Sequence, residues 1–254
     1  MKFNKVIVEA HRGASGYEHQ NTMKAFDKAI ELKADAIELD IRKTKDGKIV
    51  VVHDPTFHGV SINKMTYEEL LNETTENEIP MVQEENYHFD MHFTMPLLED
   101  VLIKYKGKIL LDIEIKEEGY EEEIVNLILS HLSVDEFQIR SFSELVIKRV
   151  KEINKDIFAI LLIGAEKPKY GIFSRFGEIF PNAKIRRSNC DAVSPHYRLV
   201  ILGFVKRMHK RNKDVYVWTV NDAKIMNKMV YKAKVDGLVT NYPDLALDVI
   251  SNKR

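Results

Sequence analysis

Short apolar runs typical of β-strands recur along the chain, and segments with helical spacing separate them. The runs occupy residues 6–10, 35–41, 108–116, 136–141, 157–163, 190–194, 215–220 and 237–241. Apolar positions three and four residues apart predict helices over residues 22–32, 120–132, 143–153, 199–210, 222–232 and 245–250. This alternation is typical of a parallel sheet covered by helices, and its eight strands predict an α/β fold closed into a (β/α)8 TIM barrel.

An open, doubly wound sheet is the alternative arrangement of the same elements. It predicts a glycine-rich phosphate turn after the first strand, and HRGASG at residues 11–16 lacks the spacing of a dinucleotide-binding fingerprint. The closed barrel is therefore favoured. Because 254 residues suit one such barrel, we expect a single domain over residues 1–254.

Two long segments, residues 54–96 and 164–189, interrupt the alternation. We expect both at the C-terminal rim of the barrel, where function concentrates in this fold, with 54–96 as a rim insertion within the domain. The first contains a short helical pattern at 66–72 and the aromatic stretch NYHFDMHF at 86–93. The aromatic residues favour satellite hydrophobic clusters under long loops, and the alternative is a substrate lid or an interaction surface.

A ninth β-like run at residues 48–53 follows Asp46-Gly47, a strong signal for a two-residue hairpin turn. Such a turn predicts a β-hairpin after the second barrel strand, with Asp40 directly opposite His53. Glu38 shares the face of Asp40, because side chains alternate along a strand. The hairpin therefore predicts an imidazole beside two carboxylates, with the ninth run outside the barrel.

Carboxylates in apolar strands require a partner, because burying an unpaired charge costs several kcal/mol. Glu38 and Asp40 lie in one such strand, and Glu114 lies in the strand LLDIEIK. Three carboxylates at a shared mouth suit a hard divalent ion such as Mg²⁺ or Ca²⁺, whereas a zinc site would need more histidines or thiolates. The alternative is that the same carboxylates form salt bridges across the barrel with Arg12, Arg42 or Lys116.

The first strand ends in His11-Arg12-Gly13, which places an imidazole and a planar cation at the same rim. Arginine matches phosphate oxygens, and glycine allows a close approach of the backbone to a ligand. His11 and His53 on opposite sides of a phosphodiester would divide general base and general acid catalysis near neutral pH. Metal-assisted hydrolysis of a phosphodiester is the chemistry that this set of residues predicts.

The composition narrows the class of partners. Lys plus Arg (38) nearly equals Asp plus Glu (39), so no global charge attracts nucleic acid or an anionic bilayer. The single cysteine, Cys190, excludes an intramolecular disulfide and indicates a reducing compartment. The apolar run near the N-terminus is too short for a secretory signal, and no later run approaches a membrane span. We therefore expect a soluble cytoplasmic protein with neither an integral membrane segment nor a nucleic acid partner.

Several motifs together resemble the glycerophosphodiester phosphodiesterase family. In chain order they are HRGASG with a following NT, AIELDIRKTKDGKIVVVHD, LDIEIK, RSF, VWTVND and VDGLVTNYPD, and they cover nearly the whole sequence. The resemblance implies a (β/α)8 barrel that hydrolyses glycerophosphodiesters to sn-glycerol 3-phosphate and an alcohol. It implies a small-molecule glycerophosphodiester as the substrate and one divalent cation as cofactor, with Mg²⁺, Ca²⁺ and Mn²⁺ as candidates.

The resemblance also implies a role for individual residues. The catalytic histidines fall on His11 and His53. The metal carboxylates fall on Glu38, Asp40 and Glu114, and phosphate contacts fall on Arg12 and Lys116. Trp218 and Phe142 match positions near the glycerol or leaving-group pocket, although Trp218 also suits an ordinary core aromatic.

The sequence departs from the family pattern in four places. Gln20 stands where the family usually has glutamate, which implies a change in metal affinity or in hydrogen bonds around the site. Asn241 stands where aspartate is common, and Asp112 where asparagine is common. The loop after Thr56 is shortened and lacks an Arg-Thr-Thr segment, which leaves the size of the substrate open.

Two alternatives share this barrel. One is a lysophospholipase D-type enzyme in which the aromatic segments hold an acyl chain. The other is a non-catalytic module that binds a glycerophosphodiester, and the retention of all the costly polar residues disfavours it. A homo-oligomer that buries the aromatic residues of 170–180 is an open arrangement, because an intramolecular cluster explains the same pattern.

Overall fold

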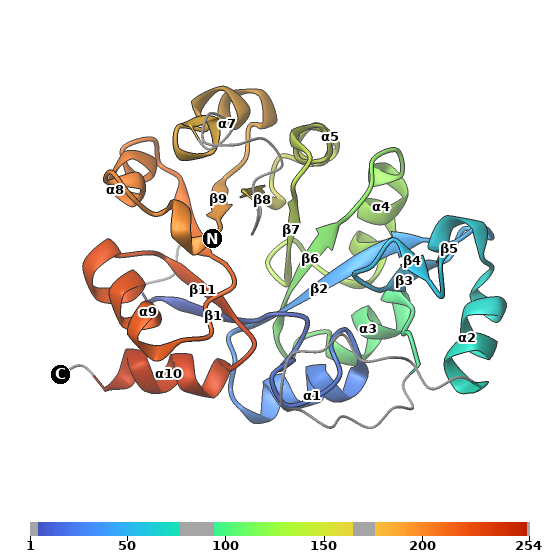
Figure 1. The fold of residues 1–254 in the computed structure, drawn as a ribbon. Helices are drawn as coiled ribbons and strands as arrows, with labels where there is room; N and C mark the ends of the chain where they lie inside the picture. The colour runs from blue at the N-terminus through green and yellow to red at the C-terminus, as the bar shows by residue number, and fades with distance from the viewer. Residues whose placement is uncertain (1–4, 77–93, 165–175, 253–254) are drawn as a thin grey trace.

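A computed structural model describes residues 5–76, 94–164 and 176–252. Its central feature is a barrel of parallel strands, β1 to β2 and β6 to β11, that closes where β1 pairs with β2 (Figure 1). The strands are β1 (Ile7–Ala10), β2 (Ala36–Lys43), β6 (Leu110–Ile115), β7 (Phe137–Ser141), β8 (Phe158–Ile163), β9 (Ala192–Pro195), β10 (Asp214–Val217) and β11 (Gly237–Thr240). Each matches a predicted run, so the predicted TIM barrel is confirmed.

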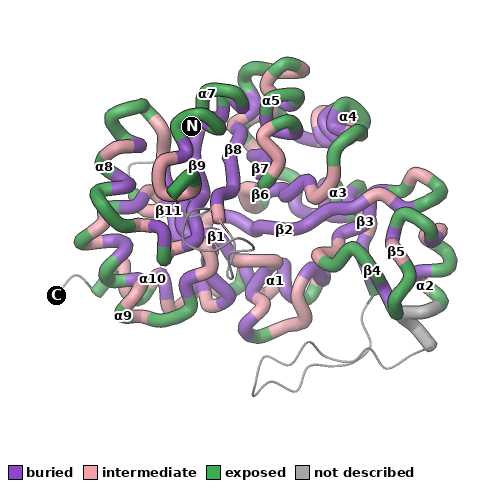
Figure 2. The backbone as a smooth tube through the Cα atoms, turned by 45° about the horizontal axis from the view of Figure 1, so that its top comes forward, coloured by how far each residue is buried: buried purple, intermediate pink, exposed green. Residues whose placement is uncertain are grey.

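Helices surround the barrel and turn their apolar sides toward its strands, while their outer sides are exposed (Figure 2). They are α1 (Met23–Glu31), α3 (Leu98–Tyr105), α4 (Glu121–His131), α5 (Glu144–Ile153), α7 (Asn182–Ser188), α8 (Phe204–His209), α9 (Ala223–Asn227), a π-helical turn η3 (Lys228–Ala233) and α10 (Pro243–Ser251). Of the predicted helix 199–210, only α8 is helical beyond Leu199, which ends a 3₁₀ turn η2 (Tyr197–Leu199). Within the described residues, every helix is too short or too polar to cross a bilayer.

Alternation along β2 separates the apolar core from the polar interior of the barrel. Ile37, Leu39 and Ile41 join the core beneath the helices. Glu38 and Asp40 therefore point to the opposite side, into the barrel. A small apolar cluster of Ile7, Ile160, Ala192, Tyr216 and Phe158 lies on the inner side of the strands, nearer their amino ends. Polar side chains consequently fill the carboxyl-terminal half of the barrel.

The predicted hairpin is present, but its predicted register is wrong by one residue. Strand β3 (Ile49–Val51) runs antiparallel to β2, with Ile41 opposite Val51. The Val52 N–H donates to the Asp40 carbonyl oxygen at 2.9 Å, so Asp40 faces Val52 and His53 lies one residue beyond.

The register differs because the turn contains three residues, Lys45, Asp46 and Gly47, instead of two. The Thr44 N–H donates to the Lys48 carbonyl at 2.9 Å and closes the ladder. The Thr44 hydroxyl in turn accepts the Lys48 N–H at 2.9 Å. Gly47 takes the left-handed conformation, with φ of 82°, that such a turn needs at its last position.

The insertion after the hairpin forms a satellite apolar cluster. Its elements are β4 (Thr56–Phe57), β5 (Val60–Ser61), η1 (Ile62–Lys64) and α2 (Tyr67–Glu76). The cluster is separate from the main core and consists of Val50, Phe57, Ile62, Met65, Leu70 and Met95. The aromatic stretch 86–93 lies outside the described residues, as do Tyr170 and Phe173, whereas Phe176 and Phe180 are described.

Candidate active site

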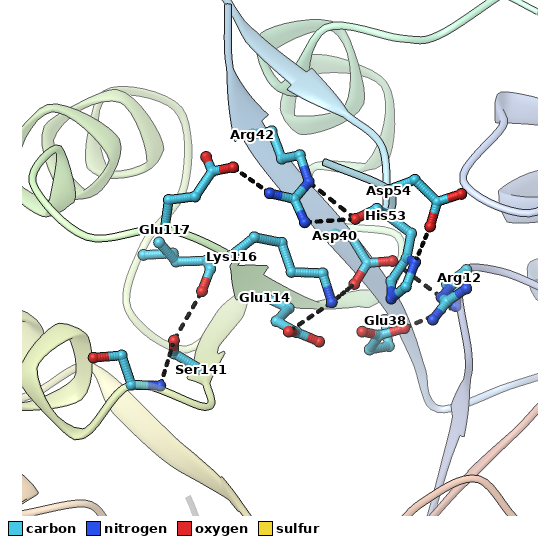
Figure 3. Close-up of polar contacts among 12 residues, drawn as sticks. Arg12, Glu38, Asp40, Arg42, His53, Asp54, Glu114, Lys116, Glu117 and Ser141 are labelled. Atoms are coloured by element: carbon cyan, nitrogen blue, oxygen red, sulfur yellow. Dashed lines mark hydrogen bonds and ion pairs between the residues drawn. The ribbon is translucent and has the colours of Figure 1, made fainter. Parts of the chain in front are cut away.

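Three buried carboxylates from two neighbouring strands converge at the mouth of the barrel (Figure 3). Glu38 and Asp40 come from β2, and Glu114 comes from β6, where it lies in register with Asp40. One oxygen from each carboxylate lies within 4.8 Å of the others. The structure thus brings together the three residues that the sequence proposed as metal ligands.

Two cations lie among these carboxylates. Lys116 Nζ is 2.8 Å from Asp40 Oδ1 and 2.7 Å from Glu114 Oε1, and Arg12 Nε is 3.0 Å from Asp40 Oδ2. Glu38 instead accepts the backbone N–H of Arg12 at 2.8 Å. The alternative of salt bridges is therefore realised for Asp40 and Glu114, while Glu38 has no ion pair among the described contacts.

The pKa values of the carboxyl groups reflect these contacts. Burial opposes ionisation of Asp40, but Lys116 and Arg12 outweigh it and hold its pKa well below the usual range. Burial and the charge of Asp40 raise the pKa of Glu38 to about 7. Burial raises the pKa of Glu114 to about 8, against the attraction of Lys116. Without a cation, Glu38 and Glu114 therefore retain protons near neutral pH, whereas a hard divalent cation among these buried oxygens would favour their ionised forms.

The two histidines lie beside this cluster, and in each ring Nδ1 has a hydrogen-bond partner. His11 Nδ1 is 2.8 Å from the amide oxygen of Asn241, and His53 Nδ1 is 2.8 Å from Asp54 Oδ1. Both partner oxygens are acceptors, so Nδ1 carries the proton and Nε2 keeps its lone pair in each neutral ring. Burial, followed by the charge of Arg12, lowers the pKa of both histidines.

Arg42 holds the backbone of His53 in place. Its Nε and Nη2 donate to the His53 carbonyl oxygen at 2.9 and 2.8 Å, and its Nη1 pairs with Glu117. Arg42 thus does not pair with Glu38, Asp40 or Glu114, the role that the salt-bridge alternative gave it. Instead it ties the end of the hairpin to the barrel.

The backbone around Arg12 is fixed by tight packing. Arg12 adopts a φ of 55° and Gly13 a φ of 80°. A Cβ on Gly13 would lie 2.6 Å from the Ala25 carbonyl carbon, so only glycine fits between the strand end and α1. This packing aims the Arg12 N–H at Glu38.

Comparison with known proteins decides the family. The sequence model of the glycerophosphoryl diester phosphodiesterase family matches residues 11–245. The chain belongs to this family. It is 36% identical to YhdW of Bacillus subtilis over 95% of this chain and 97% of that protein. It is 30% identical to the glycerophosphodiester phosphodiesterase of Caldanaerobacter subterraneus, over 97% of this chain and 98% of that protein.

A solved structure supports the same family. The glycerophosphodiester phosphodiesterase from Thermotoga maritima is 25% identical, with a TM-score of 0.73, over 97% of this chain and 99% of that chain. The resemblance seen in the sequence motifs is therefore confirmed, and the chain is a phosphodiesterase of the glycerophosphodiester class.

Two departures from the family pattern contact the residues of the site. Gln20 Oε1 accepts from Arg12 Nη1 at 2.6 Å, so its effect falls on the guanidinium and not directly on a carboxylate. Asn241 orients His11. A third residue, Asn21, donates to Asp40 Oδ2 at 2.9 Å and accepts the Asp40 N–H at 3.2 Å. Sequence reasoning gave none of these three a specific contact.

The third departure, Asp112, belongs to a second group of buried charged residues inside the barrel, which we call the buried layer. The guanidinium of Arg140 pairs with both Glu9 and Asp112, and Gln138 donates to Glu9 at 2.6 Å. All four side chains are almost completely inaccessible. Sequence reasoning missed Glu9 and Arg140, because each occurs singly in a short apolar run. The feature that could have indicated them is a single charged residue at a strand position whose side chain points into the barrel.

Trp218 and Phe142 form one aromatic wall at the mouth. Their rings pack edge to face with centroids 5.5 Å apart, and His196 packs on the indole at 5.2 Å. Trp218 Nε1 donates to the Ser194 carbonyl at 2.8 Å, which fixes the ring. Phe142 is 44% exposed. The pair is therefore a partly open apolar surface, unlike the core aromatic that was the other interpretation of Trp218.

Proposed function

We propose that this protein is a metal-dependent enzyme that hydrolyses glycerophosphodiesters to sn-glycerol 3-phosphate and an alcohol, with His11 and His53 transferring protons. The main observation in its favour is that the imidazoles of His11 and His53 both lie near the acidic cluster of Glu38, Asp40 and Glu114. The pKa values of both rings respond to the same charged neighbours, Arg12, Asp40 and Lys116.

Glu38, Asp40 and Glu114 would hold one divalent cation, with Mg²⁺, Ca²⁺ and Mn²⁺ as candidates. When bound, the cation supplies positive charge that stabilises the phosphoryl oxygens in the transition state. Arg12 and Lys116 add further positive charge at the same mouth, and the planar guanidinium suits two phosphate oxygens at once.

The two Nε2 atoms supply general acid and general base catalysis. One imidazole takes the proton from the oxygen that attacks phosphorus, and the other gives a proton to the alkoxide as its bond to phosphorus breaks. Asn241 and Asp54 hold the rings in the tautomer that this exchange needs. Each imidazole contributes about 10²- to 10⁴-fold to the rate.

The activity test follows release of glycerol 3-phosphate from glycerophosphocholine, with chelator or with each cation added back. We expect chelator to abolish turnover, and His11→Ala, His53→Ala and Glu38→Gln each to lower kcat by about 10²-fold or more. His131→Ala is the matched control, because His131 lies on α4 and pairs only with the exposed Glu99 among the described contacts. Wild-type rates in folded site variants, or full activity in chelator, would show that the proposed site is wrong.

A second assay assigns the two proton transfers. The substrate is the p-nitrophenyl ester of glycerol 3-phosphate, whose leaving group, p-nitrophenolate, departs without taking up a proton. The variant that lacks the general acid should therefore regain most of its activity on this substrate. The variant that lacks the general base stays impaired on both substrates. Equal losses on both substrates for both histidines would contradict a divided role.

A lysophospholipid is the second candidate substrate. Phe142 (44% exposed) and Leu145 (57% exposed) lie close together in the chain after β7 and give the mouth an apolar margin on that side. Such a margin suits an acyl chain as well as a small alcohol. Comparing kcat/KM for lysophosphatidylcholine and glycerophosphocholine decides between them, and activity confined to water-soluble diesters would exclude the lipid.

A further inference from the structure

The nearly neutral chain has a strongly uneven distribution of charge. Residues 182–213 contain a single acidic residue, Asp191, and a large excess of basic residues. These are Lys184, Arg186, Arg187, Arg198, Lys206, Arg207, Lys210, Arg211 and Lys213. This segment includes α7 and α8, which lie next to one another on the side of the barrel away from α2 and α3 (Figure 1). A local positive field therefore exists where the overall composition predicts none.

Large apolar side chains are exposed within the same region. Leu202 is 70% exposed and Ile201 is 47% exposed, in the loop between β9 and α8, and Phe176 is 67% exposed just before α7. Leu202 also has a φ of 49°, which is costly for a branched side chain. An exposed leucine in a strained loop contributes nothing to the core, so its position calls for another explanation.

Packing around Arg207 joins these side chains into one surface. Its Nη2 donates to the Ile179 carbonyl at 2.7 Å, and its Nη1 donates to the Leu202 carbonyl. The guanidinium lies over the Phe180 ring at 4.6 Å, and that ring packs on Phe176 with centroids 4.8 Å apart. Leu202 and Phe176 are therefore connected through Arg207 and Phe180 and do not lie on unrelated loops.

Cations without carboxylate partners occur next to Ile201 and Leu202 in the chain. Arg198, Lys206 and Lys210 are exposed, and in the part of the chain that the structure describes none of them forms an ion pair. Lys206 and Lys210 are four residues apart and share one side of α8. We call Phe176, Ile201 and Leu202, together with Arg198, Lys206 and Lys210, the basic-apolar surface.

We propose that the basic-apolar surface binds an anionic lipid membrane. The apolar side chains enter the headgroup region, while the cations pair with lipid phosphates, which is the combination that interfacial proteins use. A nucleic acid backbone matches the cations but leaves Leu202 and Ile201 without a partner. The proposal rests on this surface alone and is independent of the catalytic roles proposed above.

Membrane binding here would place the mouth of the barrel near the bilayer. The surface begins shortly after β9, and His196, the first residue after this strand, packs on Trp218 in the aromatic wall. Tyr197 stacks on His196, and Arg198 lies over Tyr197 at 5.6 Å. The chain thus passes from the aromatic wall to the basic-apolar surface within two residues. Phosphodiesters released from membrane lipids would meet the mouth close to their source.

Co-sedimentation of the full chain with vesicles tests the proposal. We expect binding to vesicles of phosphatidylglycerol and phosphatidylcholine, no binding to phosphatidylcholine alone, and weaker binding at high salt. Lys206→Glu or Lys210→Glu should weaken binding by about fivefold or more, because each basic residue near an anionic surface contributes about that factor. Leu202→Asn should weaken binding by about tenfold and suits the φ of this position, since asparagine tolerates the left-handed region.

Matched controls come from the opposite side of the barrel. Ile103, 60% exposed on α3, and the exposed Lys108 allow the same changes, Ile103→Asn and Lys108→Glu, away from the surface. These controls should bind vesicles like the wild type, and no variant should have a Tm below that of the wild type. Equal binding by the two sets of variants, or no binding to anionic vesicles at low salt, would overturn the proposal. Binding to duplex DNA that Leu202→Asn leaves unchanged, without binding to vesicles, would assign the cations to nucleic acid instead.

Discussion

Asn241 is the residue on which the orientation of His11 depends. Its amide oxygen accepts from Nδ1 at 2.8 Å, across 230 positions of sequence. Removing this acceptor frees the ring to rotate and to change tautomer. We predict that Asn241→Ala lowers kcat about 10- to 100-fold with little change in KM, as for other residues that orient a reacting group.

Asn241→Asp is the informative companion, because aspartate keeps an acceptor at the same position. It should retain most of the activity in the same steady-state assay, while Asn252→Ala, outside the site, should behave like the wild type. Wild-type kcat in the Asn241→Ala variant would mean that other contacts hold the His11 ring.

For single residues of the site, the sequence predicts the charged side chains better than the neutral side chains that orient them. Glu38, Asp40 and Glu114 stand out because ionised groups are costly in apolar strands. By this criterion Gln20, Asn21 and Asn241 do not stand out, since neutral polar residues near loops are ordinary, and the family pattern marks Gln20 and Asn241 only as departures. Their contacts depend on side-chain positions that only the folded barrel defines.

The turn of the hairpin shows that side-chain contacts also limit the prediction of whole elements from the sequence. Asp46-Gly47 correctly indicates a hairpin, but a two-residue turn and a three-residue turn share this signal. The choice depends on the Thr44 hydroxyl, which accepts the Lys48 N–H and stabilises the longer turn. A tertiary or local side-chain contact of this kind is not visible in a pattern of apolar positions.

Gly47 gives this element a direct test. Its φ of 82° disfavours any L-residue, while an added Cβ would meet only Lys43 Cε at 3.8 Å. We predict that Gly47→Ala lowers the free energy of unfolding by about 1 kcal/mol through backbone strain alone. Urea denaturation measures the change.

Gly177→Ala is the control, because Gly177 has no positive φ and open space around its Cα. It should not lower the stability, because Gly177 lies in a helical segment, residues 176–179, and alanine favours a helix over glycine. Similar effects of the two substitutions would show that the turn is not strained by a side chain.

The helices were easier to predict where their apolar side is long. The pattern over 143–153 corresponds to α5, and Ser143 caps it by accepting the N–H groups of Leu145 and Val146. The predicted helix 199–210 failed near its start, where Leu202 and Gly203 both have positive φ. Helix α3 was missed because it is short and follows the long insertion.

For the whole molecule, the buried layer of Glu9, Asp112 and Arg140 links strands β1, β6 and β7. Arg140→Met would leave two carboxylates unpaired inside the barrel. We predict a loss of about 3–5 kcal/mol in the free energy of unfolding, the usual cost of breaking a buried ion pair.

Asp112→Asn should have a much smaller effect, because it removes a negative charge from a set that already contains more carboxylates than cations. Arg149→Met, at an exposed pair with Glu122, is the matched control and should change stability by less than about 1 kcal/mol. An Arg140→Met variant as stable as this control would refute the role given to the layer.

Binding of a cation should also stabilise the molecule as a whole. A ligand that binds only the folded state adds about 2.7 kcal/mol at a concentration 100 times its Kd. We predict that Mg²⁺, Ca²⁺ or Mn²⁺ raises the Tm of the wild type, that Glu38→Gln reduces this shift, and that the exposed Glu122→Gln does not. The absence of a shift with every cation would contradict the metal site.

The hairpin and its insertion have a consequence for how the protein loses activity. The eight parallel strands close without β3, and the insertion packs around a small cluster separate from the main core. A unit of this kind opens on its own, at a lower free energy than global unfolding. Ile49 and Val51 anchor β3 in the main core, so the opening is expected in the insertion after it. Since the proposed proton-transfer residue His53 lies directly before this insertion, heating should inactivate the enzyme while most of the barrel is still folded, and amide exchange in residues 56–70 should be faster than in β6 or β7.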